Sequence, residues 1–212
     1  MSKNEINIIR PFGPSIGKVA IPIELVDKLN NYVDKIIHDK EKSDQLDFGN
    51  KLAGNVKQEF IIEKDFLESS GFLKFLAFVT SNWIKFSDAG EIKKFKIISA
   101  WIVRQFKNEY NPLHYHGGHI SGVGYLKLPK NFGGTTQSKK ATNQNGQIAL
   151  VHGSKMFNSK SIHNIVPKVG EFYLFPNYLM HTVYPFFGND EERRSVSFNA
   201  TIDEDIYNVY GS

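Results

Sequence analysis

Residues 95–106, FKIISAWIVRQF, are the stretch that decides the fold. The run is almost continuously apolar and rich in β-branched and aromatic side chains, which is typical of a strand buried on both faces. Further segments with strand character follow it, separated by turn signals rich in Gly, Pro and Asn. They are the histidine segment near 114 and residues 120–128, 147–152, 162–166, 171–175, 179–186 and 195–202. About eight short strands in series predict an antiparallel barrel or jelly roll.

The part of the chain before residue 90 has a different pattern. Apolar residues recur at helical spacing from Glu24 to His38, and a second apolar stripe runs from about Asp65 to Phe86. A polar stretch, residues 39–50, separates them. The opening segment from Ile6 to Pro22 is broken by prolines and glycines and predicts one or two short edge strands. We therefore expect a mainly β fold with two N-terminal helices packed outside it.

Composition allows one sizeable core. The 212 residues are 41% hydrophobic and 13% aromatic. There is no cysteine, so any transition metal must be held by nitrogen or oxygen. The net charge of +4 comes from lysines scattered among acidic residues, so nucleic-acid binding is not supported. The N-terminal residues lack the apolar core of a secretion signal, and there is no apolar run of about 18 residues that would span a membrane. We expect a soluble cytoplasmic protein.

Two histidines stand one residue apart in HYHGGH, residues 114–119. If His114 and His116 lie in a β-strand, their side chains point to the same face and can converge on one ion. Taken alone, such a pair is equally typical of loop histidines near a Gly-Gly turn. His119 lies past that turn, where it either supports the ligands or is exposed.

A third histidine and a basic strand follow. His181 lies in a strongly apolar segment, where a lone histidine bonded to a backbone carbonyl is the simpler interpretation. In the next segment, RRSVSFN at 193–199, strand alternation separates Arg193 and Ser195 from Arg194. If the polar face turns inward, Arg193 and Ser195 form a charged, hydroxyl-bearing site for a carboxylate.

The order of these motifs resembles that of iron(II)/2-oxoglutarate-dependent oxygenases, and most of all members found in bacteria and marine phages. The series is HxH at 114–116, SGVGYL at 121–126, GEFYLFP at 170–176, HTVxP at 181–185 and RxSxSFN at 193–199. The combination covers roughly residues 101–202 and is far more specific than any single motif. It implies a double-stranded β-helix, or jelly roll, with the two N-terminal helices packed on its larger sheet.

Carried over position by position, the resemblance implies a set of metal ligands formed by His114, His116 and His181. The metal is then iron(II). Position 116 departs from most of the superfamily, which places Asp or Glu there. A neutral third ligand leaves the iron one unit more positive, which should affect metal choice and redox potential.

The resemblance also implies a site for the co-substrate 2-oxoglutarate. Arg193 and Ser195 would hold its distal carboxylate, and the Tyr125 hydroxyl would donate to the same group. The implied reaction consumes 2-oxoglutarate and dioxygen, releases succinate and CO2, and oxidises a C–H bond of an unknown substrate, with hydroxylation as the default outcome. Residues 133–146 are then a mobile lid or an ordinary hairpin loop.

Two other functions fit parts of the pattern. A cupin-type metal protein also uses His-x-His and a distant histidine, but it typically adds a Glu a few residues later, where this chain has Ile120 and Ser121. Cupins do not require an arginine and a serine such as Arg193 and Ser195. A metal-free jelly-roll binding module, with the histidines incidental, is the third interpretation.

For organisation, we expect one domain over residues 1–212. It would have a helical buttress at about 22–90 and catalytic strands at about 95–202. Its location would be the host cytoplasm if a phage encodes it.

Overall fold

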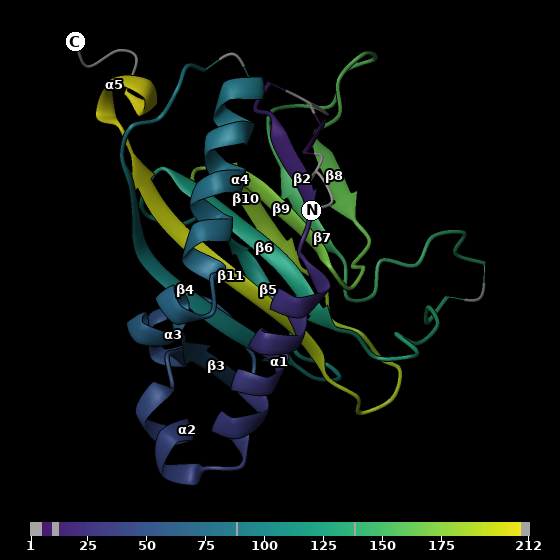
Figure 1. Ribbon diagram of the computed structural model, residues 1–212. Coiled ribbons are helices and arrows are strands. Elements are labelled where there is room, and N and C mark those ends of the chain that lie inside the picture. The colour runs from purple at the N-terminus through teal and green to yellow at the C-terminus, as the bar shows by residue number, and fades with distance from the viewer. Residues whose placement is uncertain (1–5, 10–12, 88, 138, 209–212) are drawn as a thin grey trace.

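Two antiparallel sheets and their helices are seen in a computed structural model that describes residues 6–9, 13–87, 89–137 and 139–208 (Figure 1). Within these residues the larger sheet has seven strands. Their order is β1 (Asn7–Ile9), β2 (Ile16–Ala20), β9 (Glu171–Pro176), β6 (Ile120–Lys127), β11 (Arg193–Ile202), β4 (Phe95–Gln105) and β3 (Gln58–Ile61). The smaller sheet has the order β5 (Asn111–His114), β10 (Met180–Val183), β7 (Ile148–Val151) and β8 (Ile162–Ile165). This arrangement confirms the predicted jelly roll.

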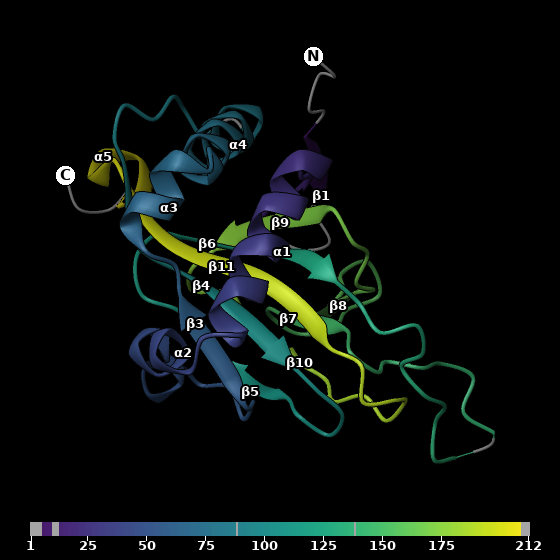
Figure 2. The same cartoon turned by 60° about the horizontal axis from the view of Figure 1, so that its bottom comes forward.

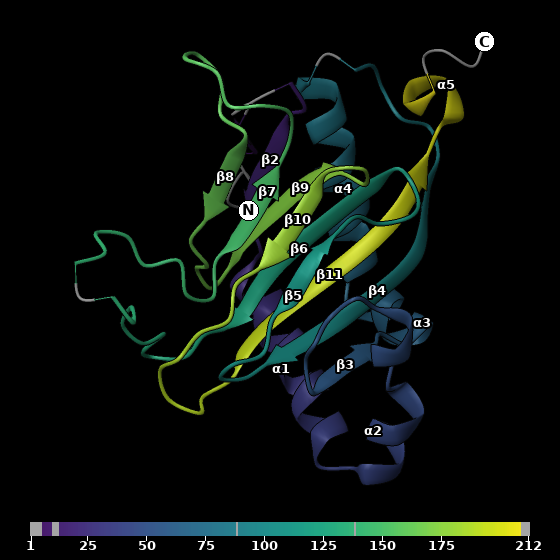
Figure 3. The same ribbon diagram turned by 180° about the vertical axis from the view of Figure 1, so that it is seen from behind.

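All helices but the short α5 come before β4 in the chain, after or between strands β1, β2 and β3. The helices are α1 (Ile23–Ile37), α2 (Lys40–Leu46), the 3-10 helix η1 (Gly49–Lys51), α3 (Lys64–Ser69), α4 (Phe72–Phe86) and α5 (Glu204–Tyr207). Helices α1 and α4 cross one face of the larger sheet, and the view from behind shows the smaller sheet against its other face (Figures 1 and 3). The buttress predicted from the two apolar stripes therefore lies on the larger sheet.

Two apolar clusters follow from this layering. One lies between the helices and the outer face of the larger sheet, where Leu29 and Val79 meet Phe172 and Phe198. The other lies between the two sheets and includes Tyr125, Leu150 and Phe175. In β9, Phe172 and Leu174 belong to the first cluster and Tyr173 and Phe175 to the second, because successive side chains of a strand point to opposite faces.

Two sequence predictions about local structure were wrong, and one further helix was not expected. The helix expected from Asp65 to Phe86 is two helices, α3 and α4, because Gly71 lies between them with a positive φ of 87°. The polar stretch 39–50 contains α2, whose first turn is capped by the Asp39 carboxylate accepting from the Lys42 amide. Strand β4 is buried on both faces only from Ala100 to Val103, and its first half alternates with solvent.

None of the helices in the described part of the chain is both long and apolar enough to cross a membrane.

Candidate active site

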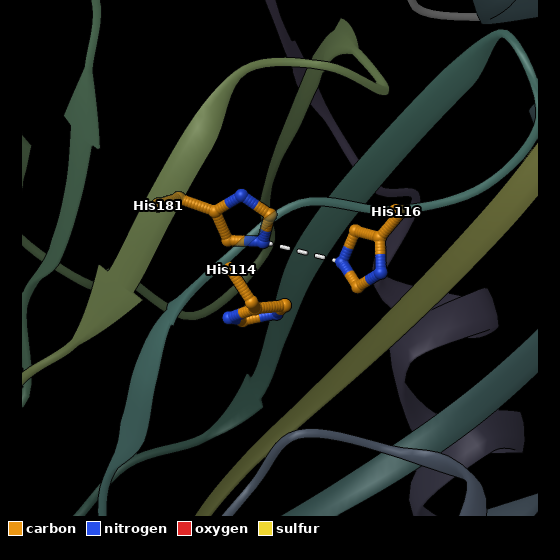
Figure 4. A group of neighbouring side chains, drawn as sticks. All are labelled: His114, His116 and His181. Atoms are coloured by element: carbon orange, nitrogen blue, oxygen red, sulfur yellow. Dashed lines mark hydrogen bonds between the residues drawn. The ribbon is translucent and has the colours of Figure 1, made fainter.

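Three histidines converge between the two sheets (Figure 4). His114 ends β5 and pairs directly with His181 of β10. His116 lies two residues past the end of β5, where its amide donates to the Asn177 carbonyl and its carbonyl accepts from the Asn177 side chain. One nitrogen from each of the three rings lies within 4.8 Å of the other two, so the group can hold one metal ion.

This geometry differs in one respect from the expectation that both histidines of the HxH motif lie in a strand. Only His114 belongs to β5, and the chain is already in a loop at His116. The loop is fixed by its bonds to Asn177, 61 residues away, so strand alternation does not aim His116. The hydrogen bonds to Asn177, which is distant in sequence, fix the position of His116.

Backbone carbonyls orient two of the imidazoles. His114 Nδ1 lies 2.7 Å from the Pro112 carbonyl oxygen, and His181 Nδ1 lies 2.8 Å from that of Leu179. Because a carbonyl can only accept, each Nδ1 carries the proton and each Nε2 is left with a free lone pair. His181 Nε2 faces His116 Nε2 at 3.2 Å (Figure 4). The lone pair of His181 Nε2 is thus placed to accept a hydrogen bond from His116 Nε2.

Burial keeps these imidazoles neutral. It lowers the pKa of His116 to about 3, with the neighbouring histidines adding to the effect. It lowers the pKa of His181 to about 4 in the same way. The pKa of His114 is also lowered by burial. Neutral imidazoles bind a divalent metal without first losing a proton.

A buried arginine lies beside the histidines on β11. Arg193 is 1% exposed; its Nε donates to the Gly146 carbonyl at 3.1 Å and its Nη1 to the Ser195 hydroxyl at 3.4 Å. Its Nη2 has no hydrogen-bond partner, and no carboxylate in the described chain pairs with it. Burial lowers the pKa of this guanidinium. A buried charge with an unfilled donor is the arrangement that an anionic ligand would complete.

Tyr125 of β6 lies next to this arginine. Its ring is 5.1 Å from the Arg193 guanidinium carbon, and its side chain is fully buried. The hydroxyl makes no hydrogen bond of good geometry to any described residue. Burial raises the pKa of Tyr125, so the hydroxyl remains a donor. Two unfilled donors therefore lie side by side.

The histidines, Arg193 and Ser195 line one hollow between the sheets. It has about 530 Å³ of empty space when its open mouth is counted. Val123, Ile148 and Phe175 form apolar parts of its wall. Apolar walls with a few polar groups are typical of a small-molecule site.

Other residues considered from the sequence lie elsewhere. Arg194 is on the opposite face of β11 and binds Glu192, Asp34 and Asn30. His119 is outside the histidine group and is not exposed: its Nδ1 accepts from the Ile202 amide.

The segment 133–146 extends from the body as a long loop (Figure 2). Ser138, within it, is outside the described residues. The end of the loop contacts the site, because the Gly146 carbonyl accepts from Arg193. Its start is bound to that end, since the Asn145 side chain donates to the Phe132 carbonyl.

The hollow also contains residues that sequence reasoning missed. Trp101 meets His116 edge-on, with ring centroids 5.5 Å apart. Glu59 and Asn111 line the same hollow, from the larger and the smaller sheet respectively. Glu59 precedes an apolar triplet that gave no functional signal, and only the pairing of β3 with β4 brings it here.

A family model described as "Putative 2OG-Fe(II) oxygenase" matches residues 99–199, just under half of the chain. The matched span contains the three histidines, Arg193 and Ser195. No curated protein matches the sequence.

Solved structures resemble the whole fold. A prolyl-4-hydroxylase from Pseudomonas putida is 14% identical with a TM-score of 0.56, covering 87% of this chain and 91% of its own. A viral collagen prolyl hydroxylase from Paramecium Bursaria Chlorella virus-1, in complex with 2OG, is 16% identical with a TM-score of 0.54, covering 87% and 94%. AviO1 from Streptomyces viridochromogenes is 14% identical with a TM-score of 0.57, covering 88% and 89%. At these identities the likeness establishes the fold.

Proposed function

We propose that the chain is a 2OG-Fe(II) oxygenase, that its three clustered histidines hold the iron and that Arg193 anchors 2-oxoglutarate. Iron(II) is its cofactor, and 2-oxoglutarate and dioxygen are its co-substrates. The observation that carries the proposal is a pair of unfilled donors: Arg193 Nη2, on a side chain that lines the hollow together with the histidines, and the Tyr125 hydroxyl next to that arginine.

The donor set suits iron(II). His114, His116 and His181 offer three imidazole nitrogens from one side, and imidazole is a ligand that iron accepts readily. The carbonyls of Pro112 and Leu179 fix two of the rings with Nε2 turned toward the site. Because all three ligands are neutral, the protein itself does not offset the charge of the metal. The dianionic co-substrate would then supply the negative charge.

The pocket beside the metal suits the distal carboxylate of 2-oxoglutarate. Arg193 offers its free Nη2, Tyr125 its hydroxyl, and Ser195 a hydroxyl already turned toward the arginine. A carboxylate accepts several hydrogen bonds at once, and bonds to a guanidinium are among the strongest in proteins. The buried guanidinium would gain the counter-ion that the chain does not provide.

Bound iron(II) and 2-oxoglutarate supply the oxidising chemistry: dioxygen is consumed, 2-oxoglutarate yields succinate and CO2, and a C–H bond is oxidised. The residues of this chain bind, orient and enclose the reactants. Arg193 and Tyr125 fix the far end of the co-substrate, while Val123, Ile148 and Phe175 keep water from its neighbourhood. Hydroxylation of the substrate is the proposed outcome.

We further propose that residues 1–212 fold as one domain, with the helical buttress at about 22–90 supporting catalytic strands at about 95–202. The apolar cluster shared by the helices and the larger sheet supports this division. A cytoplasmic location and the lack of a nucleic-acid partner stay predictions from the sequence.

Anaerobic titration tests the proposal directly. Iron(II) and 2-oxoglutarate together should produce a weak visible charge-transfer band at one equivalent of each, and air should then produce succinate. A cupin-type protein would bind the metal but give no 2-oxoglutarate-dependent band. A metal-free module would bind neither, and either result would overturn the proposal.

A further inference from the structure

Glu59 is the most unusual charged residue in the hollow. It lies on β3, the last strand of the larger sheet, and pairs with Val103 of β4, which in turn pairs with Ser195 of β11. Residues directly opposite on antiparallel strands point to the same face, so Glu59 faces the interior together with Ser195. The Glu59 side chain lines the hollow that contains the histidines.

The Glu59 carboxylate is buried and has no partner. The residue is 1% exposed, and neither side-chain oxygen accepts a hydrogen bond from any residue that the structure describes. A buried carboxylate that serves the fold is normally paired, as Glu192 is with Arg104 and Arg194. Two unfilled acceptors in the hollow that the histidines line indicate instead a group that is completed from outside.

Its position separates it from the proposed co-substrate site. One strand, β4, lies between Glu59 and Ser195, which places them about 10 Å apart across the sheet. Along the other sheet, a methyl group on Gly54 would lie 2.9 Å from Glu59 Oε1 and 3.1 Å from Asn111 Nδ2, so the carboxylate is level with Asn111. Asn111 precedes His114 by three residues of β5, or about 10 Å of strand. Glu59 therefore lies about 10 Å from both the proposed co-substrate site at Ser195 and the histidine group, a distance that a small molecule can span.

The charges at the two ends of the hollow are opposite. Arg193 at one end attracts an anion, whereas the Glu59 carboxylate at the other end repels one when it is ionised. The dianionic co-substrate is thus directed to the arginine, and the space near the carboxylate is left for a group that donates hydrogen bonds. Ammonium and guanidinium groups carry several N–H donors and a positive charge, so they would fill both oxygens.

We propose that Glu59 is a specificity-determining residue that binds a cationic nitrogen of the substrate, an ammonium or guanidinium group carried several bonds from the carbon that is oxidised. This inference rests on the proposed function of the histidine and arginine sites. The same chemistry can come from a small amine or from a lysine or arginine side chain in a peptide.

The test uses the iron(II)–2-oxoglutarate complex under anaerobic conditions and follows its visible band as probes are added. The cationic probes are butylamine and butylguanidine, 1-butanol is the neutral probe and butyrate the anionic one. The peptide Gly-Gly-Lys-Gly-Gly distinguishes a side chain in a peptide from a free amine. We expect both free cations, or the peptide, to reach half-saturation at a concentration at least tenfold below that of 1-butanol.

Two variants and a control locate the effect. Glu59→Gln keeps the shape of the side chain and should raise the half-saturation concentration of cationic probes at least tenfold. Gly54→Ala keeps the carboxylate but places a methyl group against it, and should weaken the same probes. Glu91→Gln removes the same charge from an exposed site and should leave the half-saturation concentrations of the cationic probes unchanged.

A second readout separates binding from folding. The thermal midpoint of the metal-free Glu59→Gln variant should be equal to or higher than that of the wild-type chain, because no partner is lost. A lower midpoint would show a structural role and overturn the inference. Equal responses of the wild-type complex to cationic and neutral probes would overturn it as well.

The titration distinguishes a failure of the Glu59 inference from a failure of the proposed function. If the wild-type chain forms the band but shows no preference for cations, only the role of Glu59 is lost. If no band forms, the proposed function is lost and the substrate inference falls with it.

Discussion

The two faces of the larger sheet differ in whether the chain itself satisfies the hydrogen bonds of a buried arginine. On the outer face, Arg194 is bound by Glu192, Asp34 and Asn30. On the inner face, Arg193, the next residue towards the N-terminus, binds one carbonyl and one hydroxyl and keeps a free Nη2. The chain itself satisfies the outer arginine, whereas the inner arginine keeps an unfilled donor that we propose a ligand fills. Buried polar groups that a fold needs are satisfied within it, so an unsatisfied one points to function.

Two buried histidines show the same contrast. His119 accepts from the Ile202 amide, lies 3.3 Å from a Glu204 oxygen and stacks on Tyr207 at 3.9 Å. His181 has one carbonyl partner, and its other nitrogen faces His116. The first ring joins β11 to the end of the described chain, whereas the second is turned toward the proposed metal site.

The largest expected effect is the loss of metal. His181→Ala should eliminate stoichiometric iron binding because one of three ligands disappears, and metal analysis of the purified protein measures it. His119→Ala is the matched control and should retain the iron while losing about 1 kcal/mol of unfolding free energy. A His181 variant that still contains one equivalent of iron would remove this ligand from the proposal.

Next in size is the difference between the two arginines. Arg193→Ala should weaken 2-oxoglutarate binding by about 2–5 kcal/mol, roughly 30-fold or more, because a buried charged hydrogen bond is lost. Arg194→Ala should leave that affinity close to the wild-type value and lower the unfolding free energy by about 3 kcal/mol, since Glu192 loses one of its two arginines. Binding titrations and denaturant unfolding measure the two quantities. Comparable loss of 2-oxoglutarate affinity in both variants would contradict the division between the faces.

A smaller effect is expected in the pH dependence of stability. Burial raises the pKa of Glu59 from its ordinary 4.5 to about 7, and the nearby carboxylates of Asp47 and Glu109 contribute. Because the folded state holds this proton more tightly than the unfolded state, the contribution of Glu59 to stability is full below pH 4.5 and is lost as pH rises through 7. Relative to Glu59→Gln, the wild-type chain should therefore lose about 1–3 kcal/mol of unfolding free energy between pH 4.5 and 8.

Denaturant unfolding of both chains across this pH range measures the difference. Taking the difference cancels the opposite contribution of the histidines, whose lowered pKa values make the folded chain less stable as pH falls below about 6.5. A constant difference would show that Glu59 does not titrate in this window.

The smallest effect is expected at Tyr125. Tyr125→Phe removes one unfilled donor and should weaken 2-oxoglutarate binding by about 1 kcal/mol, roughly fivefold, with little change in unfolding free energy. Tyr173→Phe is the control, because that hydroxyl is already bound to Glu171. It should leave 2-oxoglutarate affinity unaltered. Equal losses in the two variants would argue against a direct contact with the co-substrate.

Local periodicity predicts much of this molecule. Strands β4 and β6 to β11 fall on the segments expected from apolar runs and turn residues, and α1 lies almost where its apolar stripe indicates. Alternation along β11 also predicts that Arg193 and Arg194 point to opposite faces of the sheet, as the structure shows. These features depend on residues close together in sequence, which is why one sequence is enough to predict them.

Features that depend on distant partners could not be predicted. His116 is placed by Asn177, and Glu59 enters the hollow because β3 pairs with β4 some forty residues later in the chain. The break at Gly71 requires a positive φ that an apolar stripe does not reveal. The sequence therefore pointed to histidines and an arginine that the structure brings to one hollow, but it gave no signal for Glu59, which we propose selects the substrate.

The hydrogen bond from Arg193 to the Gly146 carbonyl has a practical consequence for protein engineering. It ties the base of the long loop to the interior, and side-chain bonds of Asn143 and Asn145 to the Gly133 carbonyl close that base. Insertions, affinity tags or fluorescent labels are therefore best grafted near the exposed Lys139, midway in sequence between Gly133 and Gly146. Lengthening the chain at Asn145 or Gly146 would pull directly on the arginine, so that position should be avoided.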